Sequence, residues 1–471
     1  MDGSRSGPPP AGLPTGTEAD VAADLGAFEA GVARDEGAEP AHRVVFRRMA
    51  RNVGWLLGGR GFLGVASLGY LALPARALGP RDFGLFMLIL AYGQTIANLV
   101  SFQSWQAVVR YGVPHVEAGR RDALARLVGV AAALDLAVAL VGAGLGVVAL
   151  PLAGHWLGWT TIPTRAVAAF VALLLLSTGT AASGVLRLVD RFDLLTYAEA
   201  VGPTIRLGGA ALAWWLGATL PGFLAIWAGA AIAQAAATWG CAFAAGGTRL
   251  ALGGAAFRQA VVENGRLLRF LVQTNLSASL GLLNQVGTLV VGGVAGPAAA
   301  GGFRLAAKLA KSLAKPVQLV ARALFPEFAR LVADEGRRDA ATIVLRRVTW
   351  AATAVGAVTV IVVALAGRSI LRLVTGHDYG FAYPYLVAFS IAAAIEVSGF
   401  ALEPFLNASG RAGRVLGARA IGAGAYYALL AVLVPVFGAI AAAVALILAN
   451  ALVRLRLTFD VARLLRRRHP G

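Results

Sequence analysis

The chain has 471 residues, of which 58% are hydrophobic and 14% are charged. A mean hydropathy of +0.71 excludes an ordinary water-soluble domain and predicts a protein that lies within a lipid bilayer. The formal net charge is +18, but no basic block stands apart from the apolar segments on a soluble module. We therefore expect no nucleic-acid partner.

Residues 1–42 form the first segment of the chain. Up to residue 40 it carries eight acidic residues and two arginines, with proline and glycine throughout. Such a composition is typical of a disordered chain. The segment lacks the basic start, apolar stretch and small-residue cleavage site of a signal peptide. We predict a disordered acidic tail on the cytoplasmic side.

Twelve apolar segments of about 20 residues follow, which is the length that crosses a hydrocarbon core of about 30 Å. A spanning helix satisfies its own backbone hydrogen bonds, and the period-two alternation of a membrane barrel is absent. The predicted fold class is therefore an all-α polytopic membrane protein. The expected spans are 53–73, 83–102, 127–152, 166–186, 198–216, 220–245, 270–293, 303–324, 348–366, 381–402, 418–436 and 438–453.

The loops between these spans alternate in charge. Arginines gather before the first span and after the second, fourth, sixth, eighth, tenth and twelfth spans, whereas most of the other loops carry little charge. Because positively charged loops stay on the cytoplasmic side, both termini should be cytoplasmic. Two expected outer loops depart from this rule, since they contain Arg76 and Arg81 after the first span and Arg368 and Arg372 after the ninth.

The two halves of the chain are related by an internal repeat with a shift of 217 residues. The repeated positions are Gly79, Pro80, Gly84 and Phe86, which recur as Gly296, Pro297, Gly301 and Phe303, and the sequence GRRDA, which occurs at 119–123 and 336–340. Six spans separate the copies, so both enter the membrane in the same direction. We expect two six-helix lobes, residues 43–250 and 251–471, and such lobes suit alternating access.

The eighth span carries an unusual set of cations. Only three of the 42 basic residues are lysines, and all three lie here after an arginine, as Arg304, Lys308, Lys311 and Lys315. Spacings of four, three and four place them on one face of a helix, and charges within a membrane normally face a bundle interior or a hydrated cavity. This predicts a cavity wall that binds phosphate or pyrophosphate. The alternative is an interfacial helix whose lysines reach lipid headgroups.

The repeat and the other ionisable residues extend this hypothesis. The first-lobe positions that match Lys311 and Lys315 are Gln94 and Asn98, which are also polar. Two further cations, Arg60 and Arg206, are candidate substrate-binding residues. Three acids, Asp135, Glu396 and Glu403, are candidates for exchanging a proton or binding a coupling cation. For Asp135 and Glu396, pairing with an arginine across the bundle is an equal alternative.

The sequence offers little that could hold a cofactor. Cys241 is the only cysteine, which excludes a disulfide framework and a cysteine-based metal site. No Walker motif is present, so ATP hydrolysis by this chain is not expected. We expect no metal, no cofactor and no enzymatic activity.

Four segments carry a family resemblance. They are ARALGPRDFGLF (75–86), FQSWQAVVRYG (102–112), LRLVDRFD (186–193) and ALFPEFARL (323–331). The first resembles the loop between the first two helices of Wzx-type polysaccharide flippases, which belong to the multidrug, oligosaccharidyl-lipid and polysaccharide exporter superfamily. The resemblance covers about residues 45–455. It offers no catalytic motif whose residues could be transferred.

This resemblance implies a function and a location. The expected protein is a twelve-helix, two-lobed flippase of the bacterial inner membrane, which moves undecaprenyl-pyrophosphate-linked oligosaccharides to the outer leaflet. The cargo would be a repeat unit of O-antigen, capsule or exopolysaccharide. The implied partners are this lipid-linked substrate, membrane lipids and polysaccharide polymerase machinery.

Three other functions compete with this one. A drug or cation exporter of the same superfamily is disfavoured because a cationic cavity repels cations. A major facilitator would also carry glycine-arginine-arginine loops, but GRRDA lacks the aspartate-arginine pair that precedes them in that family. A membrane-bound polymerase or lipid-linked glycosyltransferase usually has a sizeable outer loop with charged residues. Here the outer loops are short, and His155 and His377 are isolated.

Overall fold

The computed structural model describes residues 41–100, 103–159, 163–246, 250–272, 283–333, 338–376 and 379–466, and the predicted acidic tail up to residue 40 and His377 lie outside them. Every regular element in the described residues is a helix. The first half contains α2 (Ala41–Val100), α3 (Ser104–Glu117), α4 (Arg121–Val148), α5 (Leu150–Leu157), α6 (Thr164–Leu176), α7 (Thr180–Leu188), α8 (Phe192–Trp215), α9 (Leu220–Gly246) and α10 (Gly254–Glu263). The second half contains α12 (Leu283–Ala333), α13 (Arg338–Thr375), η2 (Gly380–Ala382), α14 (Tyr383–Ser398), α15 (Leu402–Ala408), α16 (Ala412–Phe437) and α17 (Ile440–Arg466).

Within the described residues, nine helical segments are long and apolar enough to cross a membrane. The expected fifth span lies in α8, and the expected seventh span lies partly outside the described residues. The exposed side chains of the spans include many large apolar residues, as is required where helices face lipid. The prediction of an all-α polytopic membrane protein is confirmed.

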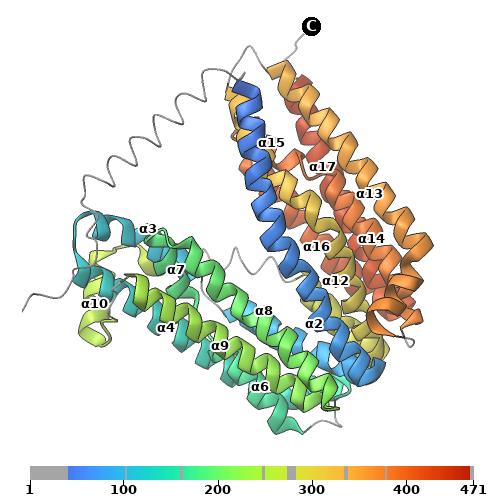
Figure 1. The fold of residues 1–471 in the computed structure, drawn as a ribbon, viewed down its shortest axis with the longest axis horizontal. Coiled ribbons are helices and arrows are strands. Elements are labelled where there is room, and N and C mark those ends of the chain that lie inside the picture. Colours follow the sequence, from blue (N-terminus) through green and yellow to red (C-terminus); the bar gives the residue numbers. More distant parts are fainter. Residues whose placement is uncertain are drawn as a thin grey trace, which may run out of the picture. The chain divides into compact units, whose positions relative to one another are not determined.

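Residues 41–58, the first part of α2, belong to a separate unit, and all contacts described below lie within residues 59–471. In the first half, α4 packs on α3, α6 and α7, and α3 packs on α7. α9 packs on α6, α7 and α8. In the second half, α14 packs on α12, α13 and α17, and α16 packs on α17 (Figure 1).

The two longest helices share the same interruption. α2 contains Gly79 with φ 70° and ψ 174°, and α12 contains Gly296 with φ 83° and ψ 173°. These positive φ angles suit glycine, and the proline that follows each glycine cannot donate a backbone hydrogen bond. Because Gly79 and Gly296 are repeat-equivalent positions, each half of the chain makes the same break at the same place.

A second pair of equivalent glycines brings the two halves into contact. A Cβ added to Gly301 would lie 2.8 Å from the Cα of Gly84, and one added to Gly84 would overlap the carbonyl of Pro297. Next to this contact, Phe86 and Phe303 are fully buried. Only glycine allows the backbones of α2 and α12 to approach this closely.

Candidate functional site

The predicted cationic stripe lies on α12, beyond the glycine contact. α12 is helical through all four positions, so their spacing places Arg304, Lys308, Lys311 and Lys315 along one face. Arg304 and Lys308 are half-buried and Lys311 is exposed, while the side chain of Lys315 lies outside the described residues. The stripe therefore begins within the packed helices and continues to a more open surface.

Arg304 contacts the other half of the chain. Its Nη2 donates a hydrogen bond of 2.9 Å to Oε1 of Gln94 on α2. The close approach of Gly84 and Gly301 puts the two helices near enough for this bond. Gln94, which the repeat matches to Lys311, is thus a direct partner of the cationic stripe.

Tyr70 joins Arg206 to the same cluster. Gly69 lies against Leu207, so α2 and α8 pack tightly at this level. The ring of Tyr70 packs edge-on against Trp227 at 5.8 Å, and its hydroxyl interacts electrostatically with Arg206 and Arg304. The side chain of Arg60, the other predicted cation, lies outside the described residues.

The cluster carries uncompensated positive charge. Among the described residues, neither Arg206 nor Arg304 forms an ion pair with a carboxylate. Lys311 interacts with Arg304 and also with Glu396, which is exposed on α14. Two guanidinium groups, a phenol and an amide from three helices can together bind an anion.

The predicted acids have different surroundings. Glu403 pairs with Arg419 at 2.8 Å, so its charge is balanced within the second half. Asp135 is buried on α4, where its Oδ2 accepts hydrogen bonds from Ser104 Oγ at 2.6 Å and from the Ala181 N–H at 3.2 Å. Its Oδ1 has no hydrogen-bond partner in the described part of the chain and borders a cavity of about 30 Å³.

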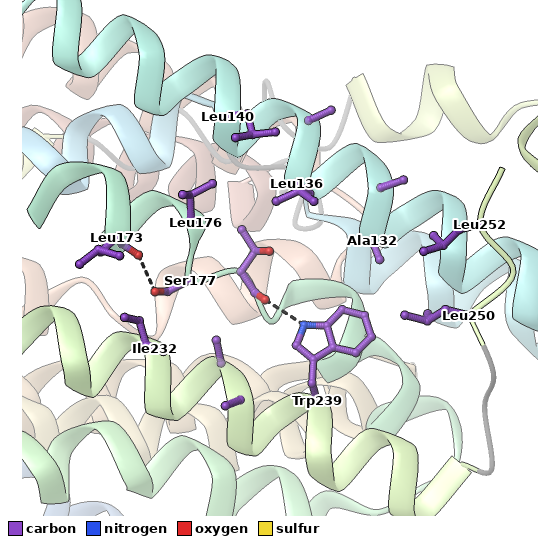
Figure 2. A pocket seen from close by; sticks show the side chains of 15 residues that line it. Ala132, Leu136, Leu140, Leu173, Leu176, Ser177, Ile232, Trp239, Leu250 and Leu252 are labelled. Atoms are coloured by element: carbon purple, nitrogen blue, oxygen red, sulfur yellow. Dashed lines mark hydrogen bonds between the residues drawn. The ribbon is translucent and has the colours of Figure 1, made fainter. Parts of the chain in front are cut away.

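A larger apolar groove lies beside Asp135. It has a volume of about 660 Å³ and is lined by side chains of α4, α6 and α9, including Leu136, Leu176 and Ile232. Figure 2 shows the break between α6 and α7 at its floor, where Trp239 Nε1 donates to the Thr178 carbonyl at 3.0 Å. A break at membrane depth is tolerated because protein groups satisfy its backbone.

A comparison with protein families agrees with this arrangement. Residues 49–332 match the family described as polysaccharide biosynthesis protein. The chain belongs to this family. The match includes α2, the first half and most of α12, and it agrees with the resemblance to polysaccharide flippases.

Other known proteins are similar to this chain in sequence or in fold. The chain is 30% identical over 348 residues to the inner membrane protein YghQ of Escherichia coli (strain K12), covering 72% of this chain and 95% of the relative. Its fold is similar to that of an inward-facing multidrug resistance MATE family transporter of the MOP superfamily, with a TM-score of 0.65, 13% identity, and 87% and 96% of the two chains covered. It is equally similar to the lipid II flippase MurJ in an inward closed conformation, with a TM-score of 0.65, 12% identity and 86% of each chain covered.

Three polar residues beside the predicted ones were not themselves predicted as site residues. Tyr70 has no charge, and tyrosines are common in membrane spans, so no sequence signal marks it. Arg419 lies within the expected eleventh span, where an arginine is as unusual as Arg206 in the fifth, and this signal could have identified it. Ser104 is recognisable only through its bond to Asp135.

Proposed function

We propose that this protein moves a lipid-linked, phosphate-bearing oligosaccharide across the bacterial inner membrane by alternating access. The observation that carries the proposal is the cluster of Arg206, Arg304, Tyr70 and Gln94. Its residues come from three helices of both halves, and its two arginines form no ion pair among the described residues. A pyrophosphate offers several oxygens to such groups, whereas a cationic drug would be repelled.

The finer identity of the cargo is part of this proposal. The family description names polysaccharide biosynthesis, and one protein with a similar fold is a flippase of lipid II. We therefore assign undecaprenyl-pyrophosphate-linked repeat units as substrate, with polysaccharide polymerase machinery as the receiving partner. The exposed apolar faces of the spans provide a surface along which the polyprenyl chain can remain in lipid.

The same proposal includes a coupling ion. Asp135 is the best-placed of the three acids, because it is buried, has no ion-pair partner among the described residues, and leaves Oδ1 unbonded. A cavity of about 30 Å³ has room for about one water molecule, and its polar lining is limited to Asp135, Thr178 and Thr180. Glu403, already paired with Arg419, is the weaker candidate.

The test uses a strain without the gene, complemented with variants. The deletion strain should lose surface polysaccharide and accumulate the lipid-linked repeat unit on the cytoplasmic leaflet. Arg206→Gln with Arg304→Gln should reproduce this defect, with at least about a tenfold loss of export, because charge-assisted hydrogen bonds to phosphate are lost. Arg258→Gln is the matched control, since Arg258 is exposed on α10.

Membrane abundance of each variant is measured in the same cells. Normal export by the deletion strain, in the absence of a redundant transporter, contradicts the proposal. If the deletion strain instead becomes sensitive to cationic drugs, the exporter alternative is favoured.

A further inference from the structure

Three arginines converge on a pocket that is separate from the cluster around Tyr70. Arg110 of α3 and Arg266 and Arg269 of the segment after α10 line a pocket of about 220 Å³, together with Tyr111 and Phe270. No acidic residue is among these lining residues. The pocket is several times larger than the ~30 Å³ that one water molecule occupies in the liquid.

Buried leucines hold the segment after α10 in place. Residues 267–272 are helical, and Leu267 and Leu271 are each only 1% exposed. They pack into an apolar cluster with Leu127 and other residues of α3, α4 and α10. Because this face is buried, Arg266 and Arg269 project from the opposite side, and both are exposed.

Aromatic rings orient the third arginine. The Arg110 guanidinium lies 4.8 Å from the ring centroid of Phe270 and 5.7 Å from that of Tyr111. The two rings also pack edge-on at 5.8 Å. A guanidinium above a ring keeps its N–H groups directed outward in its own plane, where they can bind an anion.

No carboxylate in the described residues neutralises these arginines. None of the three forms an ion pair with a residue in the described ranges. Glu263, at the end of α10, is already bound by Arg126 at 2.6 Å and by Gln259 at 3.2 Å. The pocket therefore holds three positive charges with no acidic partner in the part of the chain that the structure describes.

The position of the pocket indicates the source of its ligand. Arg110 and Tyr111 lie near the end of Ser67–Glu117, a segment long and apolar enough to cross the membrane. This end faces the expected cytoplasmic side, where the arginine-rich loops lie. A group bound here would be at the level of lipid headgroups.

We propose that Arg110, Arg266 and Arg269 form a binding site for the phosphate or pyrophosphate headgroup of an anionic membrane lipid. Planar guanidinium groups match phosphate oxygens in pairs, and phosphate binding requires no other cofactor. A role as the place where a lipid-linked oligosaccharide first binds rests on the proposed function. The binding of the headgroup itself does not.

The experiment measures lipid binding to the purified full-length protein. Native mass spectrometry in detergent compares phosphatidic acid, whose headgroup is a phosphate monoester, with phosphatidylcholine, and calorimetry tests inorganic pyrophosphate in solution. Phosphatidic acid should bind preferentially. The variant with Arg110→Gln, Arg266→Gln and Arg269→Gln should bind it at least about tenfold more weakly, whereas Arg258→Gln should stay within about twofold.

Two results would overturn the proposal. If the triple variant binds phosphatidic acid with unchanged affinity, the three arginines do not form a site. If Arg258→Gln weakens binding as much as the triple variant does, the lipid is held only by diffuse attraction to the charged surface. If the triple variant does not fold, Arg266→Lys decides, because it keeps the charge but loses the planar fork. If the arginines form a specific site, Arg266→Lys should bind phosphatidic acid several-fold more weakly than the parent protein. If the attraction is diffuse, its affinity should not change.

Two further comparisons distinguish a lipid headgroup from free pyrophosphate, and this binding site from the proposed function. Binding of pyrophosphate without any preference for phosphatidic acid contradicts the lipid assignment. Failure of the proposed function appears in the export assay of Arg206 and Arg304 variants, and it leaves this binding measurement unaffected.

Discussion

Gly84 and Gly301 show how much of this structure depends on the absence of a side chain. They occupy equivalent positions in the two repeats, and each would clash with the backbone of the other half if it carried a Cβ. The hydrogen bond from Arg304 to Gln94 is formed by the same two helices. The geometry of the cationic cluster therefore depends on two residues that contribute no chemistry.

We predict that Gly84→Ala is destabilising and also reduces export. The added methyl group would overlap the Pro297 carbonyl, so α2 and α12 must separate, at a cost of about 1–3 kcal/mol. Gly229→Ala on α9 is the matched control, because a Cβ added there would have no neighbouring atom within 4 Å and alanine favours a helix. Thermal unfolding of the two purified variants measures the difference. Equal melting temperatures would show that the glycine contact has no energetic role.

At this scale the sequence predicted the cations but not the group that connects them. Arg206 and Arg304 could be found because charges are rare in apolar spans. Tyr70 could not, since its role arises from the packing of Gly69 against Leu207, which joins residues distant in the chain. Side-chain periodicity describes one helix at a time and does not specify which helices meet.

At the scale of the element, helix ends explain one departure from the charge rule. Arg76 Nε donates a hydrogen bond of 3.0 Å to the carbonyl of Val374, and its Nη2 donates to that of Leu373. Both carbonyls belong to the last turn of α13, where the helix dipole favours a cation. Arg368 lies 5.1 Å from the ring centroid of Tyr383. These arginines on the expected outer side have structural partners, which a count of charges does not reveal.

The contact between α10 and α4 provides a prediction about pH. The hydrogen bond from Arg126 holds the pKa of Glu263 below its ordinary value. The pair therefore adds stability above the ordinary glutamate pKa of about 4.3, and this contribution is lost as pH falls through the lowered pKa. We expect Glu263→Gln to reduce stability at neutral pH by about 0.5–1 kcal/mol. The difference from the parent protein should shrink as pH falls through the lowered pKa.

Unfolding curves of the purified protein at several pH values measure this effect. Glu117→Gln is the control, because Glu117 is exposed at the end of α3 and has no ion pair among the described residues. A difference between Glu263→Gln and the parent that persists unchanged at low pH would mean that the ion pair is not its cause.

At the scale of the whole molecule, the arginine-rich loops predict both termini on the cytoplasmic side. Gly217, with φ 65°, lies in the short turn between α8 and α9, and Arg338 begins α13. Reporter domains fused after Gly217 and after Arg338 should report the outer side and the cytoplasm respectively. Reports of the same side from the two fusions would contradict the predicted topology.

The all-α membrane fold was predictable at this scale, because apolar segments of about 20 residues must form helices to span a bilayer. The number and direction of the spans stay predictions. The repeated glycine-proline pairs lie between expected spans, and there the structure has the breaks at Gly79 and Gly296 inside the long helices α2 and α12. The break between α6 and α7 was not predictable, since Ser177 to Gly179 fall inside the expected span 166–186, which contains no proline. Its position depends on the Asp135 carboxylate at the first turn of α7, which is a tertiary contact.

Gly84 and Gly301 are repeat-equivalent residues, but their contact is not symmetric: a Cβ on Gly84 would meet the carbonyl of Pro297, whereas a Cβ on Gly301 would meet the Cα of Gly84. Because the contact is made by backbone atoms, it places no demand on neighbouring side chains. The side chains around it differ between the two copies: Arg304 stands where the first copy has Met87, and Asp135 stands where the second has Ala352. The shared backbone contact therefore lies between halves of unlike chemistry, and the buried acid without an ion-pair partner among the described residues belongs to the first half alone.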